Sequence, residues 1–313
     1  MYYIYSTYGT FLQMILSDSC LAQVNYLILD EVHERQEVMD FLFIFIKHHL
    51  LSRDDLKIIL MSATMDFEDL EDYFSCKTMK IPGRSHPVSI VHKDISKSQG
   101  FVPILEIFEQ IQSIHKTRSE GAILFFLPGW KDMCILKQMI LNDEIQNTCC
   151  IFMLHSKFSK VDGNEVFKEP PKGKRKLVIS TNICESSITI DDVEHVINSG
   201  YTKVARYSHI YKLDELICKR SSDMSNIQRA GRAGRQKPGY CYQMFSPDTQ
   251  IVESEKPDLV TSSLIRLSLF IKVLDLGCIR SFFGKAVQPP KSETISYAIS
   301  DLVKKKLWTG KKI

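Results

Sequence analysis

Short apolar runs that alternate with longer amphipathic segments constrain the fold of this chain more than any other feature. Two of the longer segments, 101–115 and 133–141, carry apolar residues at the spacing of one helix face. The runs are too short for helices and have the composition of strands buried on both faces; they lie at 24–29, 57–61, 122–127, 150–154, 176–180 and 193–198. This alternation predicts an α/β fold built on parallel sheets.

Two changes of pattern divide the chain. The stretch around 90–100 is polar and separates two sets of expected strands. After 246–257 the pattern becomes helical, with apolar residues at i, i+3, i+4 and i+7 in segments 263–277 and 294–308. We therefore expect two α/β domains followed by a helical region, with no internal repeat of fixed length.

Composition indicates a soluble globular protein and excludes few functions. The 313 residues are 44% hydrophobic and 25% charged, and the net charge of +3 neither requires nor excludes a nucleic-acid partner. The nine cysteines include no CxxC pair, so we expect reduced thiols in a cytosolic or nuclear protein and no zinc site. The most apolar run, 41–46, is too short to span a membrane and is expected to be the buried face of a helix.

The string DEVHER follows the first expected strand directly. Ligands of parallel sheets bind at the carboxyl ends of the strands. There Asp30 could hold Mg²⁺, directly or through water, and Glu31 could polarise the attacking water of a hydrolysis reaction. His33 is two residues further on, where it could link a nucleotide to the neighbouring domain. The alternative is an ordinary strand end with solvated charges and a loop histidine.

A second strand end carries small hydroxyl side chains. Ser62 and Thr64, in the string SAT, follow the run 57–61. We expect them to hydrogen-bond the acidic loop and to relay the state of the nucleotide. The string is common by chance and gains weight only because it follows DEVHER.

A third strand end offers groups suited to phosphate oxygens of a nucleic-acid backbone. Thr181 and Asn182 follow the run 176–180 and have short polar side chains. Glu185 and Asp191 are acceptors that could face a ribose or a basic partner. The alternative for this stretch is a strand–turn–helix connection with capping hydroxyls.

The string QRAGRAGR carries two arginines and two glycines. Arg232 and Arg235 are three residues apart, so a helix would put both on one face. Two guanidinium groups held in this way can clamp a γ-phosphate. Gly231 allows close backbone approach, and Gln228 could orient the attacking water. The alternative is a basic helix on the surface.

Together these strings resemble one family. DEVHER, SAT, STNICESSITI and QRAGRAGR, in this order, resemble motifs II, III, V and VI of the DEAH/RHA-type helicases of superfamily 2. YSTYGTFLQMI resembles the RNA-contacting motif Ib of this family, and AILFFLPGW resembles motif IV. PPKSETISYAISDLVKKKLW resembles the winged-helix domain that follows the motor. The resemblance extends over nearly the whole chain.

The resemblance implies an ATP-dependent RNA helicase, a monomeric motor that couples ATP hydrolysis to 3′-to-5′ translocation or unwinding. It implies two RecA-like parallel-sheet domains closing over ATP and Mg²⁺. The implied boundaries are 1–91 for the first RecA-like domain, which would be incomplete, 92–246 for the second, and 247–313 for the start of a winged-helix domain.

The same resemblance assigns roles to individual residues. The residues expected to serve catalysis are Asp30, Glu31, His33, Gln228, Arg232 and Arg235. Of these, Asp30 and Glu31 are also expected to bind the metal, and the two arginines are expected to act across the cleft. The residues expected to contact the nucleotide are Ser62, Thr64, Asp191 and Gly231. The residues expected to contact RNA are Thr7, Gly9, Thr181 and Asn182.

Val32 makes the box D-E-V-H, where the family more often has D-E-A-H. The strings DEVHERQEVMDFL and KVLDLGCIRSFFGKAVQPP resemble the tudor-domain-containing helicases of the spindle-E type. That resemblance implies a role in germline piRNA silencing with piRNA-pathway proteins, in the cytoplasm and its perinuclear granules or in the nucleus. One departure is Asn198, where the family usually has Asp, so that one local contact loses a charge.

One expected element is missing. No Gly-Lys pair of the chain fits the phosphate-binding loop G-x-x-x-x-G-K-[ST]. We therefore expect the chain to be a fragment that begins inside the first RecA-like domain, whose sheet would expose apolar surface. Two other functions stay open, namely a catalytically inactive RNA-binding or scaffold protein and a DNA helicase of the same superfamily.

We predict that the 313-residue chain on its own binds ATP poorly and does not hydrolyse it, because it lacks the phosphate loop. The measurement is phosphate release by the purified chain with and without RNA. RNA-stimulated turnover that disappears in Glu31→Gln would contradict the prediction.

Overall fold

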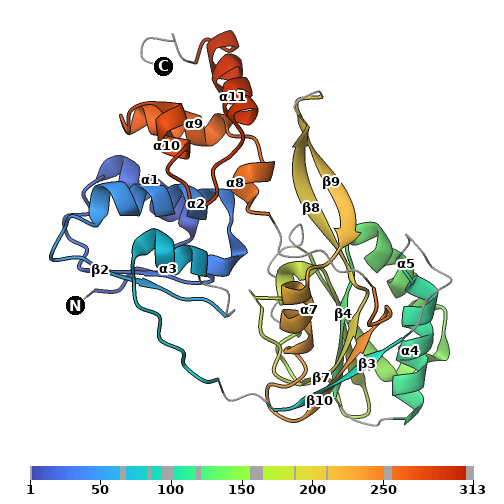
Figure 1. The fold of residues 1–313 in the computed structure, drawn as a ribbon. Coiled ribbons are helices and arrows are strands. Elements are labelled where there is room, and N and C mark those ends of the chain that lie inside the picture. Colours follow the sequence, from blue (N-terminus) through green and yellow to red (C-terminus); the bar gives the residue numbers. More distant parts are fainter. Residues whose placement is uncertain are drawn as a thin grey trace. The chain divides into compact units, whose positions relative to one another are not determined.

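The structure is a computed structural model that describes residues 2–63, 68–83, 86–93, 102–117, 121–155, 165–186, 188–208, 211–249 and 256–307. The chain forms two compact units, and each is described here by itself (Figure 1). Unit 1 consists of Met1–Lys80, Ala205–Leu216 and Lys256–Ile313. Unit 2 consists of Ile81–Val204 and Ile217–Glu255.

Unit 1 combines a two-stranded parallel sheet with helices from both ends of the chain. β1 (Tyr26–Leu29) pairs with β2 (Lys57–Leu60), with Leu27 opposite Ile58. A 3₁₀ turn η1 (Val32–Glu34) follows β1, and a π-helical turn η2 (Ile46–Leu50) follows α2. The helices are α1 (Tyr8–Ser17), α2 (Glu37–Phe45), α3 (Glu68–Phe74), α8 (Asp258–Thr261), α9 (Ile265–Val273), α10 (Ile279–Phe283) and α11 (Ser292–Lys304).

Helix α2 forms the centre of unit 1. The run Phe41–Ile46 was expected to be one buried face, but every residue in it is buried. The reason is that the C-terminal helices cover the side of α2 that would otherwise face water. The ring of Phe41 lies 5.0 Å from that of Phe282 and 6.5 Å from that of Phe270, so both ends of the chain share one hydrophobic core.

The sheet of unit 1 has one buried and one exposed face. Successive side chains of a strand point to opposite faces. In β1 this places Leu27 and Leu29 in the core and leaves Tyr26 and Ile28 exposed, with exposed fractions of 60% and 54%. Ile59 of β2 is also 44% exposed. The expectation of an apolar sheet face in contact with water is therefore met in unit 1.

Unit 2 is built on a parallel sheet with strand order β3-β10-β7-β4-β6-β5. Its strands are β3 (Val88–His92), β4 (Ala122–Phe126), β5 (Cys149–Leu154), β6 (Arg175–Ser180), β7 (Val193–Asn198) and β10 (Gly239–Gln243). Between them lie the helices and 3₁₀ turns α4 (Ile104–Thr117), α5 (Trp130–Leu141), η3 (Glu144–Thr148), η4 (Asn182–Cys184) and α7 (Asp223–Ala230).

Helices cover both faces of this sheet, α4 and α5 on one side and α7 on the other (Figure 1). Strand β4 shows how the sequence achieves this, because all of its residues are buried. Ile123 and Phe125 join the core on the side of α4 and α5, whereas Leu124 joins the core that includes Ala230 of α7. A continuous apolar run is the expected composition of such a strand.

The predicted α/β parallel fold is confirmed, and each predicted strand is present with shifts of one or two residues at its ends. Four strands were not predicted. Two of them, β3 and β10, pair with each other, so the domain boundary expected at 91/92 falls inside strand β3. The other two, β8 (Tyr201–Ser208) and β9 (Leu213–Arg220), pair with each other. No helix among the described residues is long and apolar enough to cross a membrane.

Because neighbouring residues of β1 lie on different faces, substitutions there should lower the stability of unit 1 by different amounts. Leu29→Ala should lower the free energy of unfolding of unit 1 by about 2–5 kcal/mol, because it leaves a cavity in the core. Ile28→Ala, the matched control, should change it by less than about 1 kcal/mol. Hydrogen exchange of the α2 amides in increasing urea measures both, and equal losses would contradict the assigned faces.

Candidate nucleotide and nucleic-acid site

The acidic loop, residues 30–35, begins directly after β1. Its position is fixed by a continuation of the β1–β2 ladder: Met61 N donates to Leu29 O at 2.7 Å, and Val32 N donates to Met61 O at 3.0 Å. Asp30 Oδ1 accepts a bond from the backbone N of Glu31 at 2.9 Å. The hydroxyl of Tyr8 donates to the carbonyl oxygen of Asp30.

Three of the predicted residues meet in this loop. His33 Nδ1 lies 3.2 Å from Ser62 Oγ and 3.5 Å from Glu31 Oε2. The expected hydrogen bond between the SAT string and the acidic loop therefore exists, with Ser62 as the contact. Thr64 lies outside the described residues.

The surroundings of the loop raise the pKa of Glu31 and of the adjacent Tyr8. Burial raises the pKa of Glu31, the nearby His33 opposes this shift, and Asp30 and Glu34 add to it. Burial, together with Asp30, Glu34 and Glu31, raises the pKa of Tyr8 to about 12. A carboxylate with a raised pKa is a better proton acceptor at neutral pH than an ordinary one.

One oxygen of Glu31 has an ion-pair contact but no hydrogen bond among the described residues. Its Oε2 is shielded from solvent and lies 3.5 Å from His33 Nδ1. Such a carboxylate oxygen can also accept a bond from a water or a metal-bound ligand. Within the described parts of the chain no group of three or more His, Cys, Asp or Glu side chains could hold a metal. Asp30 and Glu31 have carboxylate oxygens, the ligand type of Mg²⁺, and would hold this ion together with oxygens of a nucleotide and water.

The predicted RNA-contacting residues lie at element ends, where Thr7 and Asn182 are exposed and Gly9 and Thr181 are half-buried. In unit 1, Thr7 is the N-cap of α1 and its Oγ1 accepts a bond from Thr10 N at 3.2 Å. Gly9 lies in the first turn of the same helix. In unit 2, Thr181 and Asn182 follow β6, where the turn η4 begins. The structural alternative, a capping hydroxyl, holds for Thr7 but not for Thr181, whose side chain makes no cap bond.

Asp191 lies apart from the predicted RNA-contacting residues of unit 2. It is exposed, in the turn that precedes β7. All strands of this sheet run parallel, so the residues before β7 lie at the edge opposite to the carboxyl end of β6. The structure therefore does not bring Asp191 together with Thr181 and Asn182.

The predicted helical arrangement of the two arginines is wrong. Helix α7 ends at Ala230, and Arg232 and Arg235 lie in the turn that follows, not on one face of a helix. The cause is the backbone pairing of Gly234 with the segment before β3, since His86 N donates to Gly234 O at 2.8 Å. A Cβ at Gly234 would lie 2.5 Å from His86 O, so only glycine allows this path.

The arginine turn retains a donor with no partner. Arg232 Nη1 is buried and forms no hydrogen bond with any described residue. A buried guanidinium donor without an acceptor is suited to a phosphate oxygen, for which arginine has the matching geometry. Gln228 is partly buried on α7, and Gly231 is exposed at the C-cap of that helix.

Sequence reasoning missed the residue that fixes this turn. Arg229 is the bulkiest of the fully buried side chains, and its Nε donates to Glu185 Oε1 at 2.7 Å. Its Nη1 donates to Asn198 Oδ1 at 2.8 Å and to Tyr201 O at 3.1 Å. Glu185 therefore serves a basic partner, one of the two roles expected for it. The contact left open for Asn198 is also identified, and it is with Arg229.

Asn198 uses its whole amide in this network. Its Nδ2 donates to Asn226 Oδ1 and to Gln243 Oε1, both at 2.7 Å. Its Oδ1 also accepts a bond from Gly200 N at 3.0 Å. The two residues of this ion pair are Glu185 in STNICESSITI and Arg229, the first arginine of QRAGRAGR. They are far apart along the chain, so the sequence pattern did not indicate that they pair.

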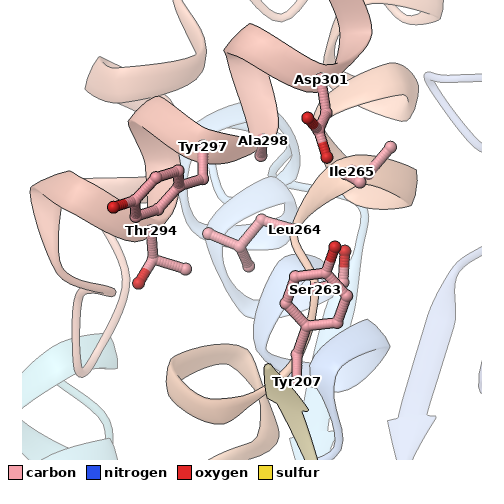
Figure 2. Close-up of a pocket in the computed structure, with 8 residues that line it drawn as sticks. All are labelled: Tyr207, Ser263, Leu264, Ile265, Thr294, Tyr297, Ala298 and Asp301. Carbon is pink, nitrogen blue, oxygen red and sulfur yellow. The ribbon is translucent and has the colours of Figure 1, made fainter. Parts of the chain in front are cut away.

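A separate cavity in unit 1 does not serve this chemistry. Figure 2 shows its lining by β8 and by residues around α9 and α11, with Tyr207 and Asp301 among them. Its volume is about 10 Å³, which is room for one water molecule and not for a nucleotide. Next to it, Lys212 between β8 and β9 forms an ion pair of 2.7 Å with Asp301 of α11.

Comparison with known proteins identifies the family of the chain. The family model of the DEAD/DEAH box helicases matches residues 2–73, and that of the helicase conserved C-terminal domain matches residues 105–237. The ATP-dependent DNA/RNA helicase DHX36 of Mus musculus is 31% identical over 96% of this chain and 37% of its own length. The ATP-dependent RNA helicase DHX29 of Homo sapiens is 31% identical over 96% of this chain and 28% of its own length.

The fold has a solved counterpart as well. The crystal structure of the E. coli DExH-box NTPase HrpB matches 97% of this chain and 38% of that chain, with a TM-score of 0.82 and 26% identity. The chain spans less than two fifths of the length of each of these relatives. Both family models match, and the chain contains the DEVHER loop and the arginine turn. The chain therefore belongs to the DEAH/DExH-type helicases of superfamily 2.

Proposed function

We propose that this chain carries the ATP-hydrolysing and RNA-contacting residues of an ATP-dependent RNA helicase. The observation that carries the proposal is the cluster of Glu31, His33 and Ser62 at the carboxyl end of β1, in which His33 Nδ1 lies 3.2 Å from Ser62 Oγ and 3.5 Å from the buried Oε2 of Glu31. Since the chain spans only part of its relatives, the activity is proposed for the protein expressed from its complete coding sequence.

In this proposal the acidic loop performs the hydrolysis. Asp30 holds Mg²⁺, which when bound neutralises charge on the phosphate oxygens. Glu31 accepts a proton from the attacking water, a role that its raised pKa favours. His33 and Ser62 transmit the state of this loop to the segment after β2 through their hydrogen bond. Thr64 and Ser62 are proposed to contact the nucleotide, for Thr64 on the sequence alone.

The arginine turn stabilises the phosphate in the transition state. Arg232 and Arg235 supply positive charge to the γ-phosphate, and the unbonded Nη1 of Arg232 supports this role. Gln228 orients the attacking water, and Gly231 lets the backbone approach the nucleotide. Asp191 contacts the nucleotide in this proposal. Its position supports this role: it precedes β7, and the arginine turn precedes the neighbouring parallel strand β10, so both lie at one edge of the unit 2 sheet.

RNA is the proposed polymer, with 3′-to-5′ translocation by a monomeric motor. Thr7, Gly9, Thr181 and Asn182 contact its backbone in this proposal. Their positions at element ends support it, with Thr7 and Asn182 exposed and Gly9 and Thr181 half-buried. The spindle-E-like strings support a role in germline piRNA silencing, in cytoplasmic perinuclear granules or the nucleus, with piRNA-pathway proteins as partners. This finer assignment is an inference from the sequence alone.

DNA is the second candidate polymer. The mouse relative is named a DNA/RNA helicase, and contacts to phosphate groups do not distinguish the two sugars. ATP turnover measured with RNA and with DNA of one sequence separates the two. Equal stimulation would remove the preference for RNA.

We predict that Glu31→Gln lowers the rate of ATP turnover about 10²- to 10⁴-fold in the complete protein, because it removes the proton acceptor. Glu34→Gln is the matched control, since Glu34 lies in the same loop and its Oε2 accepts a bond from Gln36 Nε2 at 2.6 Å. Its turnover should stay within about twofold of the parent. Comparable losses in both variants, or none in Glu31→Gln, would contradict the proposal, and an inactive parent would favour the scaffold function.

The pH dependence of turnover provides a separate prediction. The pKa of Glu31 is raised above its ordinary value of 4.5, and only the ionised form accepts the proton. Turnover should therefore fall as the pH decreases through the raised pKa, with the midpoint of the acid limb above pH 4.5. A midpoint at or below this value, in a protein still folded by circular dichroism, would contradict the assignment of Glu31.

A further inference from the structure

The acidic loop is held in a strained backbone conformation. Glu31 and Arg35, at the two ends of the turn η1, both lie in the left-handed region with φ of 54° and 46°. This region is unfavourable for residues that have a side chain, so such residues persist only where the surrounding structure fixes them. The question is which contacts fix this loop.

Two anchors come from nearby segments. At the first end, Val32 N donates to Met61 O at 3.0 Å. At the second end, the guanidinium of Arg35 forms a two-point ion pair with Asp40 of α2, with Nε 2.6 Å from Oδ1 and Nη2 3.2 Å from Oδ2. Asp40 is almost fully buried, and two-point bonds of this type are strong and directional.

The third anchor comes from the far end of the chain. Asp258 N, the first residue of α8, donates to the carbonyl oxygen of Arg35 at 3.0 Å. The next residue, Leu259, is completely buried in the core that contains α2. The left-handed Arg35 is therefore held through its side chain by α2 and through its carbonyl by α8.

The C-terminal helices have further bonds to the same unit. The hydroxyl of Tyr73 donates to Lys285 O at 2.7 Å, and Gln288 Nε2 donates to Asp69 Oδ2 at 3.2 Å. With the ring contact between Phe41 and Phe282, these bonds fix the helices to α2 and α3. A displacement of the C-terminal helices would therefore reach the acidic loop through α8.

We propose that the C-terminal segment, residues 256–307, positions the acidic loop, with Arg35 and Asp258 as positioning residues. The effect on hydrolysis rests on the proposed function, whereas the effect on the loop backbone does not.

One substitution removes the third anchor with little other change. Asp258→Pro deletes the backbone N–H that bonds Arg35, and proline is favoured at the first position of a helix. The preceding residue, Pro257, has φ −51° and ψ 142°, a conformation that a following proline accepts. Asp258→Ala is the matched control, because it removes the side chain and keeps the N–H.

The experiment is hydrogen exchange of the Val32 and Glu34 amides, together with ATP turnover, in the complete protein. Asp258→Pro should speed exchange at both amides about fivefold relative to Asp258→Ala, the change expected for one neutral hydrogen bond. It should lower kcat by a similar factor with KM unchanged, because ATP binding does not use α8. Equal exchange rates in the two variants would overturn the proposal.

A second pair of variants covers the case in which Asp258→Pro unfolds unit 1. Arg35→Lys loses the two-point bond and keeps the charge, and Arg53→Lys is its control, since Arg53 forms a similar pair with Asp55 in the same unit. Faster exchange at Val32 and Glu34 in Arg35→Lys alone supports the proposal, and equal exchange in both contradicts it. If the parent does not hydrolyse ATP, the proposed function fails while the exchange rates still decide the positioning role.

Discussion

Parallel pairing of β1 with β2 is the interaction on which the acidic loop depends. The ladder continues beyond both strands through the bonds Met61 N to Leu29 O and Val32 N to Met61 O. This continuation brings Ser62 to His33 and partly buries Glu31, which raises the pKa of its carboxyl group. The pairing of two short strands over a buried apolar face thus fixes the position of Glu31, the candidate proton acceptor. The partial burial that follows raises the pKa of its carboxyl group.

Unit 2 fixes its arginine turn with a buried ion pair instead of a ladder. Burial of the Arg229 charge would be costly without partners, and Glu185 and Asn198 supply them. The amide at Asn198 serves better here than the carboxylate expected from the family, because it also donates to Asn226 and Gln243. Glu185 already neutralises Arg229, so a second negative charge is unnecessary. The turn that follows can then present Arg232 with a free donor.

Much of this arrangement could be predicted from the sequence, where the physical signal was local. Apolar runs located the buried strands, and strand ends located Glu31, Ser62 and Thr181. The strands β3, β8, β9 and β10 were missed because they are partly exposed or short and carry polar residues that hide the apolar pattern. The end of α7 was missed because it depends on the pairing of Gly234 with His86, a contact between distant segments. The same limit hid the bond between Asp258 and Arg35.

The most direct test of nucleotide binding at the acidic loop is paramagnetic broadening of amide resonances by Mn²⁺–ATP in the complete protein. Mn²⁺ takes the same oxygen ligands as Mg²⁺. The strongest broadening is expected at residues 30–33 and 62, and only when ATP is present, because the described residues contain no cluster that could hold the ion alone. Broadening that spares this loop, or that is equally strong without ATP, would contradict the assignment of Asp30 and Glu31.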